Sequence, residues 1–342
     1  MVAAMSNCKK VSVVMCTYNG SKYIREQLDS ILNQTYPIFE LLVQDDNSQD
    51  DTFLILQEYE KKVPYMHVIR NERNVGIARN FKSIFDRAQG EYIVIADQDD
   101  IWIENKIALL LETMEDNYLV VSASYLLYGK YDASVKRDIA SESPDFLFQE
   151  QRYVALQATL SGHDMLFKKE LLSHIPEVYW QSYWYDFCLA VVAIGMNKII
   201  YSDRYLTLWR RHDNAYSYAK KSHNKYILFL QLFIPLVNKA SRNDVKTFYR
   251  LLLPALKQNE IAYQFARYLS EGKLWHACWF TYVHRTLFVN TEKVKGIRLL
   301  LRSFLIPLLT CRNIKNWHSM YLGDKNIMKA SFKNDLDRSE TI

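Results

Sequence analysis

Three aspartates at the end of one apolar segment are the residues of this sequence best suited to chemistry. The segment EYIVIA (91–96) is followed directly by Asp97-Gln98-Asp99-Asp100. Like charges this close repel one another, so the pKa of at least one carboxyl should rise when no cation is bound. Hard oxygen ligands favour Mg²⁺ or Mn²⁺, which commonly bind substrate phosphates as well. We therefore predict a divalent metal site here. The alternative is a cap of the following helix, but a cap needs only one carboxylate.

A second acidic pair, Asp45-Asp46, follows the apolar segment FELLVQ (39–44). An acidic residue at such a strand end commonly binds the nucleoside part of a ligand. Its carboxylate can accept hydrogen bonds from an imide N–H of uracil or thymine, or from ribose hydroxyls. An Asx turn that leads into a helix is the alternative. Beside the metal motif, we favour nucleotide binding.

The turn after the first apolar segment has no glycine-rich phosphate loop, because it reads Cys16-Thr17-Tyr18-Asn19-Gly20. A dinucleotide would lack the GxGxxG cradle for its pyrophosphate, which argues against a nicotinamide enzyme. The same lack of a phosphate loop argues against a nucleotidyltransferase. The charge available to neutralise a diphosphate is then the predicted metal.

These residues need a scaffold, and the first 125 residues alternate short apolar segments with amphipathic ones. The amphipathic segments carry apolar residues at helical spacing, for example Ile24, Leu28 and Ile31. Strands separated by helices predict a mostly parallel sheet with helices on both faces, whose ligands lie beyond the carboxyl ends of the strands. The aspartates fall at those ends. The predicted strands are 11–16, 39–44, 67–70, 91–96 and 118–124.

Four motifs, in this order and spacing, resemble family 2 inverting glycosyltransferases with a GT-A fold, and most closely bacterial rhamnosyltransferase-like members. They read CTYNGSKYIREQLDSILNQTY, LLVQDDNSQDDT, NVGIARNF and GEYIVIADQDDIW, and the resemblance spans residues 10–215. It implies a UDP- or dTDP-linked sugar donor and a divalent metal, Mg²⁺ or Mn²⁺. It also implies single-displacement transfer to an acceptor hydroxyl in the assembly of a surface glycan, such as an O-antigen or a capsule.

The resemblance also implies roles for single residues of the nucleotide-binding half. Asp97 and Asp99 match the family's DxD pair, with Asp99 the more direct metal ligand. Arg79 and Asn80, which follow the NVG motif, are expected to face the diphosphate. The residues expected to contact the base and ribose are Thr17, Tyr18 and Asp46.

A later carboxylate is the predicted general base. Similar enzymes often carry His-Asp-Trp-Trp at the start of a helix, and this chain has Tyr185-Asp186-Phe187 there, so Asp186 matches while tyrosine replaces the histidine. An aspartate walled by aromatic side chains can be desolvated enough to accept a proton near neutral pH. A helix cap is the alternative for Asp186.

The segment Trp209-Arg210-Arg211-His212 resembles the family's Tyr-Arg-x-His segment. The resemblance makes His212 a third metal ligand or a contact of the β-phosphate. Either Arg210 or Arg211 would stabilise the leaving diphosphate, and we predict Arg211. The segment 160–164 is the expected acceptor-side loop, in which a glycine permits close backbone approach and His163 has no assigned role.

The charge of the chain is unevenly distributed. Residues 1–215 carry a net charge of −8 and residues 216–342 a net charge of +13, for a total of +5. We divide the chain accordingly into a glycosyltransferase domain (1–215, with a nucleotide-binding half 10–125 and an acceptor half 126–215) and a basic helical region (216–342). Anionic partners suit the basic region. Among them we favour a lipid-linked glycan acceptor and an anionic membrane surface over nucleic acid.

Within the basic region, the segment 297–309 predicts an amphipathic basic helix of the interfacial type. Its apolar run is shorter than the roughly 20 residues needed to span a bilayer. A packed helical subdomain or an oligomer contact is the alternative, and the sequence predicts no oligomeric state. Its apolar stripe consists of Ile297, Leu300, Leu301, Phe304, Leu305 and Leu308.

Composition sets the wider limits. The 342 residues are 49% apolar and 24% charged, which is typical of a globular protein and excludes a disordered or collagen-like chain. The five scattered cysteines include no CxxC pair, and the first ten residues do not resemble a secretory signal. We therefore expect a cytoplasmic protein, peripheral at the inner face of the membrane. The rival from another class is an inactive nucleotide-sugar-binding scaffold protein.

Overall fold

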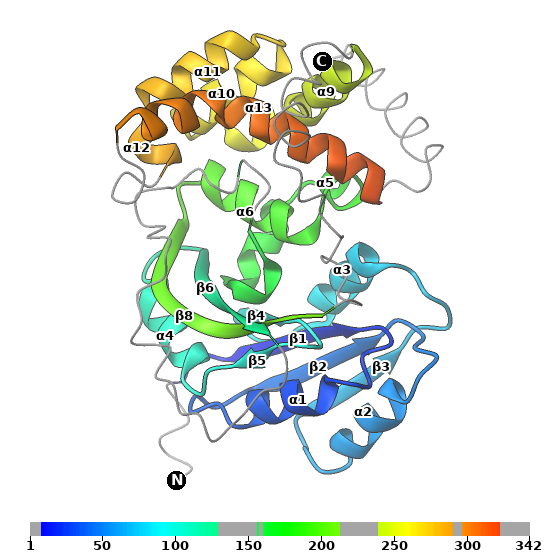
Figure 1. Cartoon of the computed structure of the whole chain (residues 1–342). Helices are drawn as coiled ribbons and strands as arrows, with labels where there is room; N and C mark the ends of the chain where they lie inside the picture. Colours follow the sequence, from blue (N-terminus) through cyan, green and yellow to red (C-terminus); the bar gives the residue numbers. More distant parts are fainter. Residues whose placement is uncertain (1–7, 129–155, 157–159, 213–238, 290–295, 322–342) are drawn as a thin grey trace.

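A computed structural model of the chain describes residues 8–128, 156, 160–212, 239–289 and 296–321. A mixed sheet with helices on both faces forms one part, and five further helices cover one end of it (Figure 1). The strands are β1 (Val11–Thr17), β2 (Glu40–Asp45), β3 (Met66–Arg70), β4 (Tyr92–Ala96), β5 (Ile101–Trp102), β6 (Leu119–Tyr128), β7 (Met165–Lys168) and β8 (Ile199–Arg211).

Helices connect most of these strands. In the sheet-containing part they are α1 (Ile24–Leu32), α2 (Thr52–Glu60), α3 (Ile77–Arg87), α4 (Lys106–Met114), α5 (Glu177–Ser182) and α6 (Tyr185–Gly195), with the 3₁₀ turns η5 (Gly162–Asp164) and η6 (Lys169–His174). The helical part consists of α9 (Lys239–Leu256), α10 (Glu260–Ser270), α11 (Leu274–Val283), α12 (Arg285–Phe288) and α13 (Gly296–Tyr321).

The eight strands form one sheet in the order β3-β2-β1-β4-β7-β6-β8-β5. The first four strands in this order run parallel, and β6 also runs parallel to β8. Strand β7 is antiparallel to both of its neighbours, and β5 is antiparallel to β8. The mostly parallel sheet flanked by helices that the sequence predicts is therefore confirmed, and the carboxyl ends of β1, β2 and β4 meet at one edge.

Alternating side chains of β1 feed two cores on the two faces of the sheet. Val13 and Met15 pack with the apolar stripe of α1 on one face, while Val14 packs with α3 and α6 on the other. Residues of a strand alternate between faces, so a strand buried on both sides must be apolar throughout. This explains why β1 reads VSVVMCT and is buried along almost its whole length.

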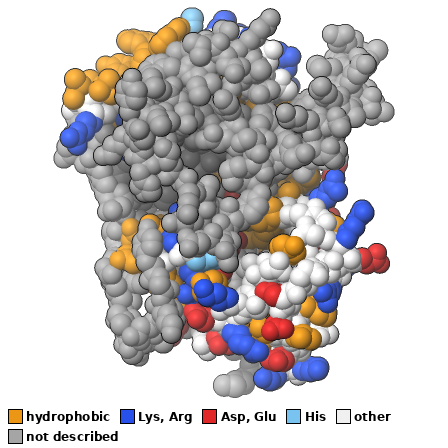
Figure 2. Space-filling model, turned by 45° about the vertical axis from the view of Figure 1, so that its right-hand side comes forward, with side chains coloured by type: hydrophobic (Ala, Val, Ile, Leu, Met, Phe, Trp, Pro, Cys, Tyr) orange, Lys and Arg blue, Asp and Glu red, His pale blue; other side chains and the backbone are white. Residues whose placement is uncertain are grey.

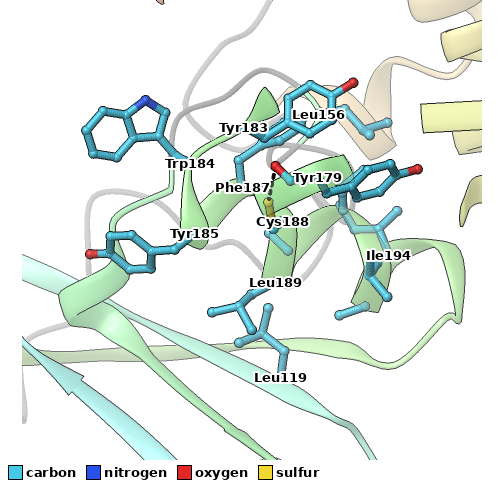
Figure 3. Packing of buried hydrophobic residues seen from close by; sticks show 14 of the residues in the cluster. Leu119, Leu156, Tyr179, Tyr183, Trp184, Tyr185, Phe187, Cys188, Leu189 and Ile194 are labelled. Carbon is cyan, nitrogen blue, oxygen red and sulfur yellow. Dashed lines mark hydrogen bonds between the residues drawn. The ribbon is translucent and has the colours of Figure 1, made fainter. Parts of the chain in front are cut away.

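The helical part continues the core on the α6 face. Tyr179 and Tyr183 donate hydrogen bonds from their hydroxyls to backbone carbonyls of α9, each at 2.7 Å. A Cβ on Gly195 would lie 1.9 Å from the Ala255 carbonyl oxygen, so only glycine permits this contact between α6 and α9. Figure 3 shows the aromatic packing around α6. The predicted domain boundary near residue 215 lies outside the described residues and stays a prediction.

Three details of the fold do not follow from the sequence patterns. Residues 199–211 form one strand, β8, of 13 residues. Pro254 and Pro307 lie inside α9 and α13, although a proline usually ends or kinks a helix. The helix after the acidic motif begins at Lys106 with Asn105 at its N-cap, so neither Asp99 nor Asp100 caps it. In the part of the chain that the structure describes, each helix is too short or too polar to cross a membrane.

Candidate metal and catalytic site

The candidate site lies at the sheet edge where β1 and β4 end. The Gln98 side chain joins the two strand ends, since it accepts a hydrogen bond from the Tyr18 N–H at 2.9 Å and donates one to the Tyr18 carbonyl at 3.1 Å. The Tyr18 side chain itself remains exposed. This places the residue predicted to contact the nucleoside beside the acidic motif that follows β4.

A buried histidine holds the acidic motif from within. His163, in η5, is buried, and its Nδ1 lies 2.9 Å from Asp97 Oδ2 and 3.5 Å from Asp100 Oδ2. Its Nε2 lies 2.9 Å from Ser124 Oγ. Burial alone lowers the pKa of His163, but Asp164, Asp100 and Asp97 together raise it to about 10. The imidazolium form therefore supplies an internal positive charge beneath the aspartates.

Lys106 adds a second internal cation. Its Nζ is buried and donates to the His163 carbonyl at 2.6 Å and to Thr207 Oγ1 at 2.7 Å. Burial lowers the pKa of Lys106 to about 8, although Asp164, Asp100 and Asp97 act in the opposite direction. The lysine ties α4, η5 and β8 together beneath the site.

Asp99 faces a different histidine at the mouth of the site. Its Oδ2 lies 2.8 Å from His212 Nε2, which brings together two of the residues predicted to bind metal. Burial, reinforced by the charge of Asp97, raises the pKa of Asp99 above its usual value. Burial also raises the pKa of Asp100. The pKa of both carboxyl groups is thus raised, but the main cause is burial and not the predicted repulsion between like charges.

One group of carboxylate and imidazole side chains among the described residues is close enough to hold a divalent cation, because Asp97, Asp100 and His163 offer ligand atoms within 4.8 Å of one another. The buried Asp100 Oδ2 has no hydrogen-bond partner, although His163 Nδ1 lies 3.5 Å from it. Asp99 and His212 form a second set of two side chains, with Oδ2 and Nε2 2.8 Å apart. The carboxylates of both sets fit Mg²⁺ or Mn²⁺.

Exposure separates the two sets. The Asp100 and His163 side chains are 0% and 3% exposed, whereas Asp97, Asp99 and His212 keep 35%, 20% and 17% of their side-chain surface. A cation that also binds a diphosphate needs ligands that reach the open side of the site. The exposures therefore favour the set that contains Asp99 and His212 for a metal shared with substrate.

The two arginines before His212 have different surroundings. Arg210 is buried, donates from Nε to the Asp99 carbonyl at 2.8 Å, and pairs with Glu26. Arg211 is only half-buried, and its guanidinium carbon lies 3.5 Å from the centroid of the Trp209 ring. Arg210 thus fixes the end of β8 against α1. Stabilisation of a leaving diphosphate by Arg211 stays a prediction.

The acidic pair after β2 is bonded within the protein. Asp46 accepts hydrogen bonds from the Asn71 side chain at 2.7 Å and from the backbone N–H groups of Val75 and Gly76 at 2.8 and 2.9 Å. Asp45 accepts from the Thr17 hydroxyl at 3.0 Å. These bonds fix the loop before α3, and the predicted nucleoside contacts of Thr17 and Asp46 stay untested.

The two residues predicted to face the diphosphate lie on different sides of α3. Asn80 is buried, donates to the Gln44 carbonyl at 3.1 Å and accepts from Asn71 at 2.9 Å, so it joins α3 to the sheet. Arg79 is exposed at the start of the same helix. The diphosphate contacts of both residues stay predictions. Because Arg79 is exposed, it is better placed than Asn80 to contact a diphosphate.

Asp186 lies in the first turn of α6 among aromatic side chains. Trp184, Tyr185 and Phe187 beside it are buried, and Figure 3 shows them around the start of the helix. Burial, opposed by a 2.7 Å hydrogen bond from the Phe187 N–H and reinforced by the charge of Asp97, raises the pKa of Asp186 to about 7. The carboxyl is therefore suited to exchange a proton near neutral pH.

Tyr185, which replaces the family's histidine, packs inward. Its ring stacks on Phe81 with centroids 3.9 Å apart, and a Cβ on Gly162 would lie 2.3 Å from its hydroxyl oxygen. The Tyr185 side chain therefore occupies the space beside Gly162 that a Cβ would fill.

Sequence reasoning missed several residues that build the site. Glu26 of α1 pairs with Arg210 at the end of β8, and the ring of Tyr23, the N-cap residue of α1, lies 4.8 Å from the ring of His212. Lys106 and Gln98 also escaped notice. A polar residue within an apolar helix stripe, such as Lys106, was the available signal, but its partners are distant in sequence.

Comparisons with known proteins identify similar chains. Residues 12–175 match the family model "Glycosyl transferase family 2". The putative teichuronic acid biosynthesis glycosyltransferase TuaG of Bacillus subtilis is 40% identical over 111 residues, which cover 32% of this chain and 44% of that protein. The Escherichia coli glucosyltransferase WfgD, whose acceptor is α-D-GlcNAc-diphosphoundecaprenol and whose donor is UDP-Glc, is 34% identical over 123 residues, covering 36% and 46%. This chain spans less than half the length of these two relatives.

Among solved structures, S. aureus TarS 1-349 in complex with UDP-GlcNAc superposes with a TM-score of 0.52 at 18% identity, covering 91% of each chain. This likeness extends over the sheet and the helical part alike, and it shows a common fold.

Proposed function

Residues 12–175 of this chain belong to glycosyl transferase family 2, and we propose that the protein transfers a sugar from a nucleoside-diphosphate donor to an acceptor hydroxyl, with inversion at the anomeric carbon. The observation that carries the proposal is Asp186. Its half-buried carboxyl has a pKa raised to about 7 by burial, and it lies within electrostatic reach of Asp97 and His163. A desolvated carboxylate facing an acidic cluster is an arrangement typical of catalytic sites.

Asp186 would act as the general base. Its carboxylate accepts the proton of the acceptor hydroxyl as that oxygen forms a bond with the anomeric carbon. The bond from this carbon to the diphosphate oxygen breaks at the same time, and the nucleoside diphosphate leaves with the electron pair. Attack from the face opposite the leaving group in one displacement inverts the anomeric configuration.

The residues at the mouth of the site would serve the leaving group. Asp97, Asp99 and His212 would hold a Mg²⁺ or Mn²⁺ ion, which when bound supplies positive charge to the diphosphate. Arg211 would add a further positive charge there. His163 contacts Asp97 from below, and Lys106 fixes His163 by donating to its carbonyl, so the acidic cluster keeps its arrangement without a substrate.

The substrate class is supported by the relatives. TuaG is named for teichuronic acid biosynthesis and WfgD acts on a diphosphoundecaprenol-linked sugar. We propose a UDP- or dTDP-linked sugar as donor and a glycan or lipid-linked glycan of a surface polymer as acceptor. We also propose action in the cytoplasm.

A donor panel tests the proposal. Thermal unfolding is measured with UDP- and dTDP-linked sugars, each with and without Mn²⁺. A true donor at 100 times its Kd adds about 2.7 kcal/mol to the free energy of unfolding. We expect one donor to raise Tm only when Mn²⁺ is present, and to be consumed slowly by hydrolysis. If no donor of the panel shifts Tm, the proposed transfer is wrong.

An inactive binding protein is the second candidate, and the same panel separates the two. Such a protein would show the shift in Tm, yet it would neither hydrolyse the donor nor transfer its sugar. Free nucleoside diphosphate released from the stabilising donor, detected by a coupled assay, supports the enzyme. The proton-accepting character of Asp186 favours the enzyme.

A further inference from the structure

Helices α11 and α13 leave a large hydrophobic surface open to solvent. On α11 the exposed side chains follow helical spacing at every fourth residue, and on α13 they occupy the first turns. We call this set the α11/α13 surface. Its members and their exposed fractions are Trp275 (57%), Trp279 (61%), Val283 (50%), Ile297 (73%), Leu300 (38%) and Leu301 (56%).

The two stripes lie on adjoining helices. Helices α11 and α13 pack against each other, since Thr281 Oγ1 donates to the Ser303 carbonyl at 2.8 Å. The rings of Trp275 and Phe304 stack with centroids 6.1 Å apart. Figure 2 shows hydrophobic and basic side chains together on the upper part of the molecule, which the helical region forms.

These apolar side chains are not exposed because the two helices lack a buried core. Each helix already buries another face, where Ala277, Cys278 and Thr281 of α11 and Ile306 and Leu308 of α13 are fully covered. The sequence predicts a single apolar stripe on 297–309, but the structure splits it. Its first residues lie on the surface and its last residue, Leu308, lies in the core. Large apolar side chains exposed together on two packed helices mark an interaction site.

The charge around this surface is one-sided. Between Lys273 and Gly323 the sequence has eight lysines and arginines and a single acidic residue, Glu292. Arg298 and Arg302 are exposed on α13 beside the apolar side chains. Exposed tryptophans flanked by basic residues suit the boundary between lipid headgroups and acyl chains, especially where the lipids are anionic.

We propose that the α11/α13 surface docks onto a bilayer that contains anionic lipids. Trp275, Trp279 and Ile297 enter the boundary region, while Arg298 and Arg302 contact the headgroups. A second copy of this chain is a poorer occupant, because a symmetric contact would bring two basic surfaces together. The inference does not depend on the transfer reaction, which uses the opposite part of the molecule.

Vesicle flotation tests this proposal with the full chain. Wild type is mixed with phosphatidylcholine vesicles, with and without phosphatidylglycerol, and bound protein is measured in the floating fraction. We expect binding only to the anionic vesicles, and weaker binding as salt rises. The double variant Trp275→Gln/Trp279→Gln should bind at least about tenfold more weakly, because two apolar side chains no longer enter the lipid.

Variants that lack positive charges measure the electrostatic contribution to vesicle binding. Arg298→Gln/Arg302→Gln should weaken binding to the anionic vesicles about fivefold per arginine. Matched controls are Leu54→Gln, which changes an exposed apolar residue of α2, and Lys61→Gln/Lys62→Gln, which removes two exposed charges that follow α2. These controls should bind as wild type does.

Three outcomes would overturn the proposal. The first is that wild type does not float with anionic vesicles, and the second is that the tryptophan variant floats as well as wild type. The third is a concentration-dependent dimer in sedimentation that the tryptophan variant loses, without vesicle binding, which would assign the surface to a second copy. Donor turnover in solution, measured on the same variants, should remain unchanged. If wild type shows no donor turnover at all, this result counts against the proposed transferase function and not against the proposed membrane surface.

Discussion

Two acidic clusters lie at the same edge of the sheet, and they differ in their hydrogen-bond partners and in the pKa values of their carboxyl groups. After β2, Asp45 and Asp46 are buried and accept hydrogen bonds from hydroxyl, amide and backbone N–H groups. After β4, Asp99 and Asp100 have a raised pKa because burial strips their solvent, and one oxygen of Asp100 has no hydrogen-bond partner. The hydrogen bonding of the first cluster is complete, whereas that of the second is incomplete, although His163 lies 3.5 Å from the unbonded Asp100 oxygen.

The difference indicates which carboxylates position the chain and which ones act on a ligand. A carboxylate that accepts several N–H groups is stabilised in its charged form and holds a loop. A desolvated group with charged neighbours is a better candidate for catalysis or metal binding. Asp186 belongs with the second cluster, because burial and the charge of Asp97 raise its pKa to about 7.

The largest effect should come from Asp186→Asn, which keeps the size of the side chain but removes the proton acceptor. We expect kcat for transfer to fall about 10³-fold, since general base catalysis contributes roughly 10² to 10⁴. Donor binding, measured by thermal shift, should persist. Asp203→Asn, at an exposed position of β8, is the matched control and should keep full activity. Retained transfer in the Asp186 variant would remove this residue from the base role.

The next effect concerns stability. Asp46→Ala removes the acceptor of three hydrogen bonds and leaves two backbone N–H groups of the 75–76 loop without it. We expect the free energy of unfolding to fall by about 2–3 kcal/mol in urea titrations. Asp99→Ala should cost no stability, because the folded state no longer carries a desolvated carboxylate. Equal losses in the two variants would abolish the distinction between the clusters.

The smallest expected effect is the pH dependence of activity and of stability that the raised pKa of Asp186 causes. If Asp186 must be ionised, kcat/KM should fall about tenfold per pH unit below pH 7 and level off above it. The same raised pKa means that the folded protein binds a proton which the unfolded chain has lost, so stability falls as pH rises towards 7. Asp186→Asn should therefore gain stability relative to wild type at about pH 8 but not at about pH 4. An identical pH dependence of unfolding in both proteins would contradict the assigned pKa.

The sequence predicted the arrangement of the sheet because its first strands are apolar throughout and alternate with amphipathic helices. The sequence also predicted that the aspartates after β2 and β4 lie at one edge of the sheet, because the carboxyl ends of parallel strands meet there. The antiparallel strand β7 was missed. Its four residues, Met165–Lys168, are too few to show a period that separates a strand from a short helical segment.

The sequence could not separate the two acidic clusters, because the distinction depends on partners that are distant in the chain. His163 lies 66 residues from Asp97, and Arg210 lies 111 residues from Asp99. Asn80 is buried and donates a hydrogen bond to the Gln44 carbonyl, which its sequence position did not indicate, and its predicted contact with the diphosphate stays a prediction. Residue type and strand end identify a polar position, but only the packing shows whether its hydrogen bonds are already complete.

Calorimetric titration of the donor's nucleoside diphosphate tests the central claim most directly. With Mn²⁺ present, wild type should bind the nucleotide and Asp99→Ala should bind at least about 100-fold more weakly. Without Mn²⁺, the two proteins should bind equally weakly. Equal affinity of both proteins in the presence of Mn²⁺ would contradict the claim that the incomplete acidic cluster after β4 holds a cation against the diphosphate.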